Sequence, residues 1–222
     1  MGALPLVLAL TFATGVVDAV GFLGLDRVFV GNMTGNVVVL GMGLAGADDL
    51  PVVGPALALV GFALGAFVGG RLVRGSGWSR RTAVLVGVTG VVVAATAVLV
   101  LLAGDDPAYG VTVGTTTALG AAMGLQAATA RAVGVKDVTT VVVTSTITGL
   151  FADAGRSGSW RDAGRRSTAV VLMLLGALVG ALLLLVHAAA GLALAAAVTL
   201  VVAVLGLWPA RRTSPNAVGA TG

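Results

Sequence analysis

The sequence predicts an all-α integral membrane protein with about six transmembrane helices and two short re-entrant segments, arranged as two inverted-topology repeats. The first observation is composition: of 222 residues, 58% are hydrophobic and only 10% are charged. Soluble domains are about 45–50% apolar and about 25% charged. The second is the division of the chain into apolar segments by short charged stretches. The third is a weak internal repeat.

Eight candidate segments lie between the charged stretches, and a helix that spans a membrane needs about 20 mainly apolar residues. Two of the eight are polar. One carries Asn32, Thr34 and Asn36, and the other is short and rich in threonine. We expect both to be poor lipid-facing helices. In chain order the segments are 3–25, 28–47, 51–70, 82–104, 110–130, 138–152, 168–186 and 188–208.

The positions of the basic residues restrict the topology, because cytoplasmic connections carry an excess of Lys and Arg. If all eight segments cross, the basic residues are divided almost evenly between the two sides. If segments 28–47 and 138–152 instead enter and leave on one side, every basic residue except Arg27 lies inside. A third topology, with only 138–152 re-entrant and the amino terminus outside, places all 13 inside. Charge alone does not separate the last two.

The internal repeat favours the topology with two re-entrant segments. A shift of 110 residues lays Thr34 on Thr144, so that GNMTGN at 31–36 faces VVVTST at 141–146. Each half then has three crossings, an odd number, so the halves must be inserted with opposite orientation. We expect a single transmembrane domain over 1–208, with repeat one at about 3–104 and repeat two at about 110–208. A disordered cytoplasmic tail is expected at 209–222.

Glycines at four-residue spacing form a ridge in each half. Gly61, Gly65 and Gly69 form the first, and Gly176 and Gly180 form the second at a shift of 115 residues. Small residues at this spacing let helices approach closely in lipid. Both internal packing and a homodimer are compatible with these ridges.

The candidate binding residues are polar side chains inside apolar segments. Asp18 is the one acid well inside a segment, and a carboxylate there costs about 2.5–3.5 kcal/mol on insertion scales. It is either a proton or cation site or an acid bonded to nearby backbone, and a pair with Arg131 is expected only if 28–47 crosses. Gln126 either lines a cavity or joins two helices. The predicted substrate-binding set is Asp18, Asn32, Thr34, Asn36, Gln126, Thr140, Thr144 and Thr146.

Several function classes lack the side chains they need. The chain has no Cys, no Glu and one histidine, His187, so we expect no enzyme, no metal site and no cofactor. The arginines lie between apolar runs rather than on one face, which suits membrane edges and argues against nucleic acid. The expected partners are membrane lipid and a small polar solute or ion.

Two stretches of the sequence resemble a known family. Asp18-Ala19, Phe22-Leu23 and the run VFVGNMTGN at 28–36 form the first, and MGLQ at 123–126 with Arg131 forms the second. They are similar to the YoaK-like bacterial integral membrane proteins, whose domain is of unknown function. Members typically have Asn where Ala127 stands here. The resemblance implies a multi-spanning inner-membrane protein and marks these polar positions without giving them roles.

The expected function is a small-solute or ion transporter or permease, with a site at mid-membrane between two polar broken helices. Such a protein would lie in the bacterial inner membrane with its carboxyl terminus in the cytoplasm. The alternative is a membrane scaffold, chaperone or lipid-binding subunit, in which the polar segments serve packing.

Overall fold

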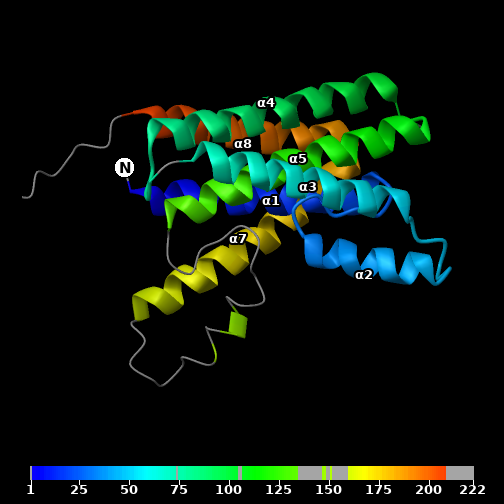
Figure 1. Cartoon of the computed structure of the whole chain (residues 1–222), viewed down its shortest axis with the longest axis horizontal. Coiled ribbons are helices and arrows are strands. Elements are labelled where there is room, and N and C mark those ends of the chain that lie inside the picture. The colour runs from blue at the N-terminus through cyan, green and yellow to red at the C-terminus, as the bar shows by residue number, and fades with distance from the viewer. Residues whose placement is uncertain are drawn as a thin grey trace, which may run out of the picture.

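The computed structural model describes residues 2–73, 75–104, 107–134, 147–148, 151 and 160–208. In these ranges every regular element is a helix (Figure 1). The predicted all-α fold is therefore confirmed. The helices are α1 (Ala3–Gly24), α2 (Met33–Leu44), α3 (Val53–Leu72), α4 (Arg80–Ala103), α5 (Tyr109–Val133), α7 (Trp160–Leu184) and α8 (Ala188–Leu207).

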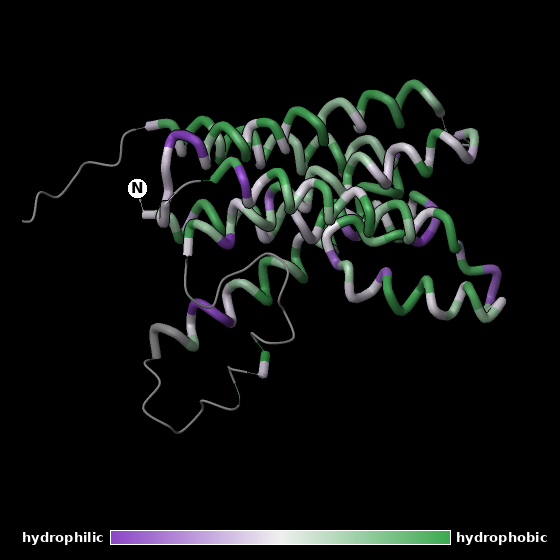
Figure 2. Tube along the Cα trace, viewed as in Figure 1, coloured by the Kyte–Doolittle hydropathy of each residue, from purple (hydrophilic) through white to green (hydrophobic). Residues whose placement is uncertain are grey.

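Five of these helices, α1, α3, α4, α7 and α8, are long and apolar enough to cross a membrane. Figure 2 shows hydrophobic residues along the helices and strongly hydrophilic ones mainly near their ends. The sixth long helix, α5, has 25 residues and a length of about 37 Å. It is rich in Thr and Gly, and about half of its residues are buried by neighbouring helices. A polar helix of this kind spans a membrane only inside a bundle.

Most predicted segment boundaries lie within three residues of the observed ones; the exceptions are the starts of α2, predicted at 28 and observed at Met33, and of α7. The sequence predicts α7 from residue 168, whereas the helix begins at Trp160. Charged residues end an apolar window without ending a helix, because arginines near a membrane edge extend their heads into water. The segment predicted at 138–152 lies outside the described residues except for 147–148 and 151, and the tail 209–222 lies outside them entirely.

The two halves of the chain pack with the same pattern of helix pairs. Helices α1, α3 and α4 of the first half correspond to α5, α7 and α8 of the second. The packing of α1 along α7 corresponds to that of α5 along α3, and the contact of α1 with α8 corresponds to that of α5 with α4. α4 and α8 pack against each other along one side of the bundle, at the top of Figure 1, and link the two pairs through the contacts of α8 with α1 and of α4 with α5. α1 and α7 run parallel, because Phe12 meets Gly176 and Val16 meets Gly180 further along both helices. This pattern gives the molecule an internal pseudo-two-fold symmetry.

The glycine contacts of the first pair recur in the second at constant spacing. Equivalent positions of α1 and α5 are 109 residues apart (124 − 15), and those of α3 and α7 are 111 apart (176 − 65). The predicted shift of 115 residues for the glycine ridges is therefore wrong by one helical turn. Gly15 lies against Met173 and Ala177, as Gly124 lies against Phe62 and Ala66. Gly176 lies against Phe12, as Gly65 lies against Ala121. Gly180 lies against Val16 and Ala19, as Gly69 lies against Leu125 and Ala128.

Helix α2 enters and leaves the bundle at one end. At 12 residues it is about 18 Å long, too short for a hydrocarbon core of about 30 Å. The start of α3 lies where α1 ends, because Gly54 packs against Val28 and Asp26. Segment 28–47 therefore does not cross, and α1 and α3 run in opposite directions. α4 starts at the end where α3 finishes and runs back along α8 and α5, and each later long helix reverses again, so the second half is inverted relative to the first.

The two ends of the bundle differ in charge. The start of α4 meets the ends of α8 and α5, since Trp78 donates to the Gly206 carbonyl over 3.0 Å and Gly77 donates to the Ala132 carbonyl over 3.3 Å. We call this the basic end. It holds Arg71, Arg80, Arg81 and Arg131, and α1 begins there. Asp26, Asp48 and Asp49 lie in the connections at the opposite end.

Candidate functional site

Asp18 lies inside the bundle on α1 and is only 5% exposed. It is six residues before Gly24, or about 9 Å from the end of the helix. Its Oδ1 accepts hydrogen bonds from the backbone amides of Val30, Gly31 and Asn32, at 3.0, 2.6 and 3.3 Å. These donors offset the cost of burying the carboxyl group. They also hold the residues before α2 inside the bundle.

The chain reaches Asp18 by turning back at the end of α1. Asp26 and Arg27 adopt left-handed backbone conformations, with φ of 60° and 54°, and reverse the chain. Val28 and Val30 then pass back alongside α1, fully buried. Arg27 donates to the carbonyl of Asp48 over 3.1 Å and so joins the connections on either side of α2. Helix α2 therefore begins at the edge of the bundle, level with Asp18, and runs toward the end where α1 ends (Figure 1).

Two asparagines fix the start of α2. Asn32 caps the helix, since its side-chain oxygen accepts from the Gly35 amide at 3.2 Å. Asn36 is fully buried; its side-chain oxygen accepts from the Phe29 amide at 2.8 Å, and its amide donates back to the Phe29 carbonyl. The Phe29 ring stacks on Phe22, with centroids 4.5 Å apart. These side chains are thus bonded to the segment's own backbone.

Glycine is required at position 31 because the loop passes very close to α1. A Cβ there would lie 2.9 Å from the methyl group of Thr14 and 3.4 Å from each oxygen of Asp18. The Thr14 hydroxyl accepts a hydrogen bond from Gln126 of α5 over 3.1 Å and donates to the Leu10 carbonyl. Gln126 therefore joins two helices, and a polar row runs through the bundle from Asp18 to α5.

One atom of this site remains unpaired. Oδ2 of Asp18 is buried and has no hydrogen-bond partner among the described residues. It lies near the amino-terminal end of α2, where the partial positive charge of the helix dipole is concentrated. A carboxyl oxygen in this position can take a proton, a cation or a hydrogen-bond donor of a solute. In the described part of the chain, no group of three or more acids and histidines is close enough to hold a metal ion.

The structure brings together four of the eight predicted binding residues. Asp18, Asn32 and Asn36 surround one loop, and Gln126 bonds Thr14, whose methyl group lies against Gly31 of that loop. Thr34 lies exposed on the first turn of α2. The other three, Thr140, Thr144 and Thr146, lie outside the described residues.

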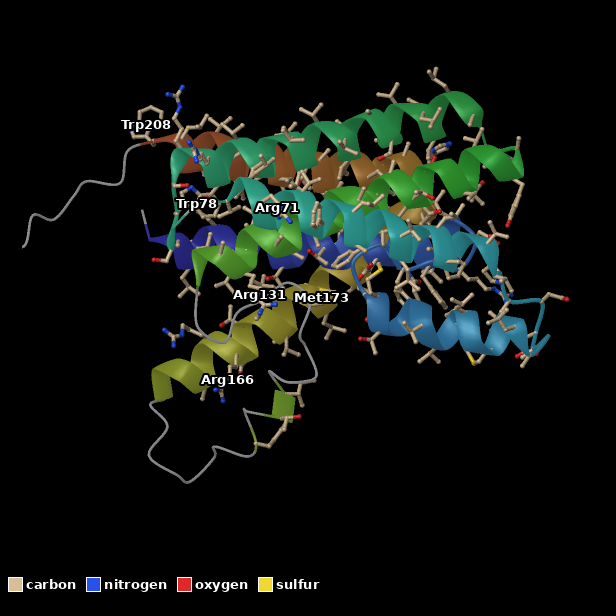
Figure 3. The ribbon with its side chains drawn as sticks, in the orientation of Figure 1. Arg71, Trp78, Arg131, Arg166, Met173 and Trp208 are labelled. Carbon is tan, nitrogen blue, oxygen red and sulfur yellow. The ribbon has the colours of Figure 1, made fainter. Side chains whose placement is uncertain are left out.

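Arg131 is far from this site. It is exposed in the last turn of α5, at the basic end (Figure 3), whereas Asp18 lies toward the opposite end of the bundle. This arrangement agrees with the expectation that the two residues pair only if segment 28–47 crosses.

Sequence reasoning missed Thr14 and Phe29. Thr14 precedes Asp18 by one helical turn and shares its face, so its spacing was an available signal. Phe29 bonds Asn36 through its backbone amide, and a backbone hydrogen bond has no signature in the sequence.

The comparisons with known proteins agree with a membrane fold. Residues 6–205 match the family model described as protein of unknown function (DUF1275). The UPF0700 transmembrane protein YoaK of Bacillus subtilis (strain 168) is 27% identical over 184 residues, which cover 78% of this chain and 80% of that protein. No solved structure matches the chain. With its long apolar helices, the chain is a multi-pass membrane protein and belongs to the DUF1275 family of proteins of unknown function.

Proposed function

We propose that this protein is a permease for a small polar solute or an ion, with its binding site at Asp18 and the start of α2. One observation carries the proposal. The buried loop before α2 enters the bundle next to a carboxyl group whose Oδ2 has no partner among the described residues, and the short helix α2 begins beside it at the edge of the bundle. Irregular backbone at membrane depth is tolerated where it lines a cavity or is buried in protein, and in secondary transporters such broken helices form the binding site.

The inverted repeat supports alternating access, in which one part of the bundle rocks against the rest. α1 packs along α7 and α3 packs along α5, so each of these pairs combines helices from both halves of the chain. α4 and α8 also pack closely against each other, because Gly90 of α4 lies against Leu200 of α8. The closely packed pairs therefore do not follow the division into repeat one and repeat two.

We propose that the basic end faces the cytoplasm of a bacterial cell, with both termini on that side. The described arginine side chains at this end are Arg71, Arg80, Arg81, Arg131, Arg165 and Arg166, whereas the described part of the opposite end has only Arg27 beside three aspartates. The excess of arginine on one side is what the positive-inside rule uses to set orientation.

We also propose that the protein is not an enzyme. Its one histidine, His187, caps α8, and the Nδ1 atom accepts from the Ala189 amide at 3.0 Å. A general base would need that nitrogen free and a reacting group within hydrogen-bond distance.

The second candidate is a scaffold or lipid-binding subunit. It is favoured by the bonding of Asn32, Asn36 and the Oδ1 atom of Asp18 to the backbone of one loop, since these groups then serve structure. In a scaffold, the start of α2 stays in one position, so that water reaches it from no more than one side of the membrane.

Labelling of a cysteine at Thr34 separates the two candidates without knowledge of the substrate. The chain has no native cysteine, and Thr34 is exposed at the start of α2. We expect Thr34→Cys to react with a membrane-impermeant maleimide from outside in whole cells and from the cytoplasmic side in inverted vesicles. The control is Leu64→Cys on the apolar outer face of α3, which should react from neither side. Reaction of Thr34→Cys from one side only would favour the scaffold.

A further inference from the structure

A cavity of about 710 Å³ opens at the basic end of the bundle. It lies between the last turn of α3 and the first turns of α4, away from Asp18 and α2. Its lining combines three arginines with three aliphatic side chains: Arg71, Arg80, Arg81, Leu72, Val84 and Leu85.

The arginines of this cavity have no acidic partner in the described part of the chain. Arg71 is exposed and lies over the ring of Phe67, 4.6 Å from its centroid, and Arg80 and Arg81 are exposed on the first turn of α4. The aspartate side chains that the structure describes lie on α1 or in the connections at the opposite end. The amino-terminal end of α4 adds the positive end of a helix dipole. Among the side chains that the structure describes, the positive charge of the cavity is thus uncompensated.

The cavity also has an apolar side at the level of the membrane edge. Leu72 is 50% exposed and Val84 is 51% exposed, and both continue into the outward apolar faces of α3 and α4. Trp78 and Trp208 lie at this same end of the bundle (Figure 3). Tryptophan and arginine at the ends of spanning helices mark the headgroup layer. Cationic groups at that depth beside apolar helix faces match the shape of a phospholipid.

We propose that this cavity binds an anionic glycerophospholipid, with the phosphate between the three arginines and an acyl chain along Leu72 and Val84. Basic pockets between spanning helices on the cytoplasmic side bind lipid headgroups through the same chemistry. Guanidinium groups suit phosphate because they donate several hydrogen bonds in a planar fork. A zwitterionic headgroup brings an ammonium group into a site whose described charged side chains are all arginines, so it binds less well. The proposal does not depend on transport.

The test measures lipid retained by the full-length protein purified in a neutral detergent. Phosphatidylglycerol and phosphatidylcholine of the same acyl chains are added, and bound lipid is counted by native mass spectrometry. We expect the unchanged protein to prefer phosphatidylglycerol. Arg71→Gln with Arg81→Gln should lose this preference, with about fivefold weaker binding for each arginine removed. The control is Arg131→Gln, which removes an arginine at the same end outside the cavity lining and should retain the preference.

Three outcomes would overturn the proposal. The first is equal binding of the two lipids by the unchanged protein. The second is an equal loss of the preference for phosphatidylglycerol in the Arg131→Gln control, which would mean that the lipid is attracted to the whole basic end rather than to the cavity. The third is displacement of the lipid by inorganic phosphate at comparable concentration, which indicates a site for a soluble anion. If the double variant does not fold, Arg71→Gln alone is used, because its side chain is exposed.

Discussion

Replacing Gly65 or Gly176 by leucine is expected to prevent the bundle from packing, and the two variants should fail to a similar extent. Gly65 faces the backbone carbonyl of Ala121, and Gly176 faces that of Phe12. A Cβ at either position would overlap this carbonyl, and backbone gives way less easily than a flexible side chain. Overpacking of a core typically costs about 1–3 kcal/mol, and we expect at least the upper part of that range.

The measurement is the thermal unfolding midpoint in detergent, together with the fraction that elutes as a single species in size exclusion. The controls are Gly70→Leu on α3 and Gly114→Leu on α5, where nothing lies within 4 Å of the new Cβ. Both should be neutral or slightly stabilising, because leucine is a better helix former than glycine. Gly65→Leu with the stability of Gly70→Leu would contradict the packing of α3 on α5. A large effect at only one of Gly65 and Gly176 would contradict the symmetry.

Removing the Asp18 carboxyl group should release the loop before α2. In Asp18→Ala, the amides of Val30, Gly31 and Asn32 lose their acceptor inside the bundle. An unsatisfied buried donor costs about 1–3 kcal/mol, so the combined loss is on the order of 3 kcal/mol or more. We expect hydrogen exchange to become much faster over residues 28–36 and to stay unchanged in α4.

Asp18→Asn is the matched variant, because its amide oxygen can still accept from the same backbone groups. It should keep most of the protection over residues 28–36. Unchanged exchange in Asp18→Ala would contradict the structural role of the three amides. Asp18→Asn also separates the structural role from the proposed function. If this variant keeps the loop in place but loses cation or proton flux, the flux depends on the carboxyl group itself.

The sequence predicts the crossing helices well because apolar length is a direct physical requirement of the bilayer. The start of α7 was missed since arginines at a membrane edge do not end a helix. The glycine ridges were recognised but matched one turn out of register. Gly61, Gly65 and Gly69 recur every four residues, so the glycine ridge of α7 can be aligned with them equally well at two shifts that differ by four residues. Only the three-dimensional contacts of Gly65 and Gly176 fix the register.

The candidate site was predicted in part. Asp18 stands out because it is an acid deep in an apolar segment, but its partners are backbone amides, which have no sequence signature. The same holds for Asn36, whose side chain pairs with the backbone of Phe29. The hydrogen bond between Gln126 and Thr14 joins helices far apart in the chain, so it depends on how α1 and α5 pack.

The fold requires that the two halves of the chain are inverted and that segment 28–47 does not cross the membrane. Single cysteines at Gly2, Ser76 and Asp48 test it directly in intact cells with a membrane-impermeant maleimide, because the chain has no cysteine of its own. Gly2 and Ser76 lie at the basic end, and Asp48 lies at the opposite end. We predict labelling of Asp48→Cys in intact cells and of Gly2→Cys and Ser76→Cys only after lysis. Labelling of Gly2→Cys together with Asp48→Cys in intact cells would contradict the inverted repeat.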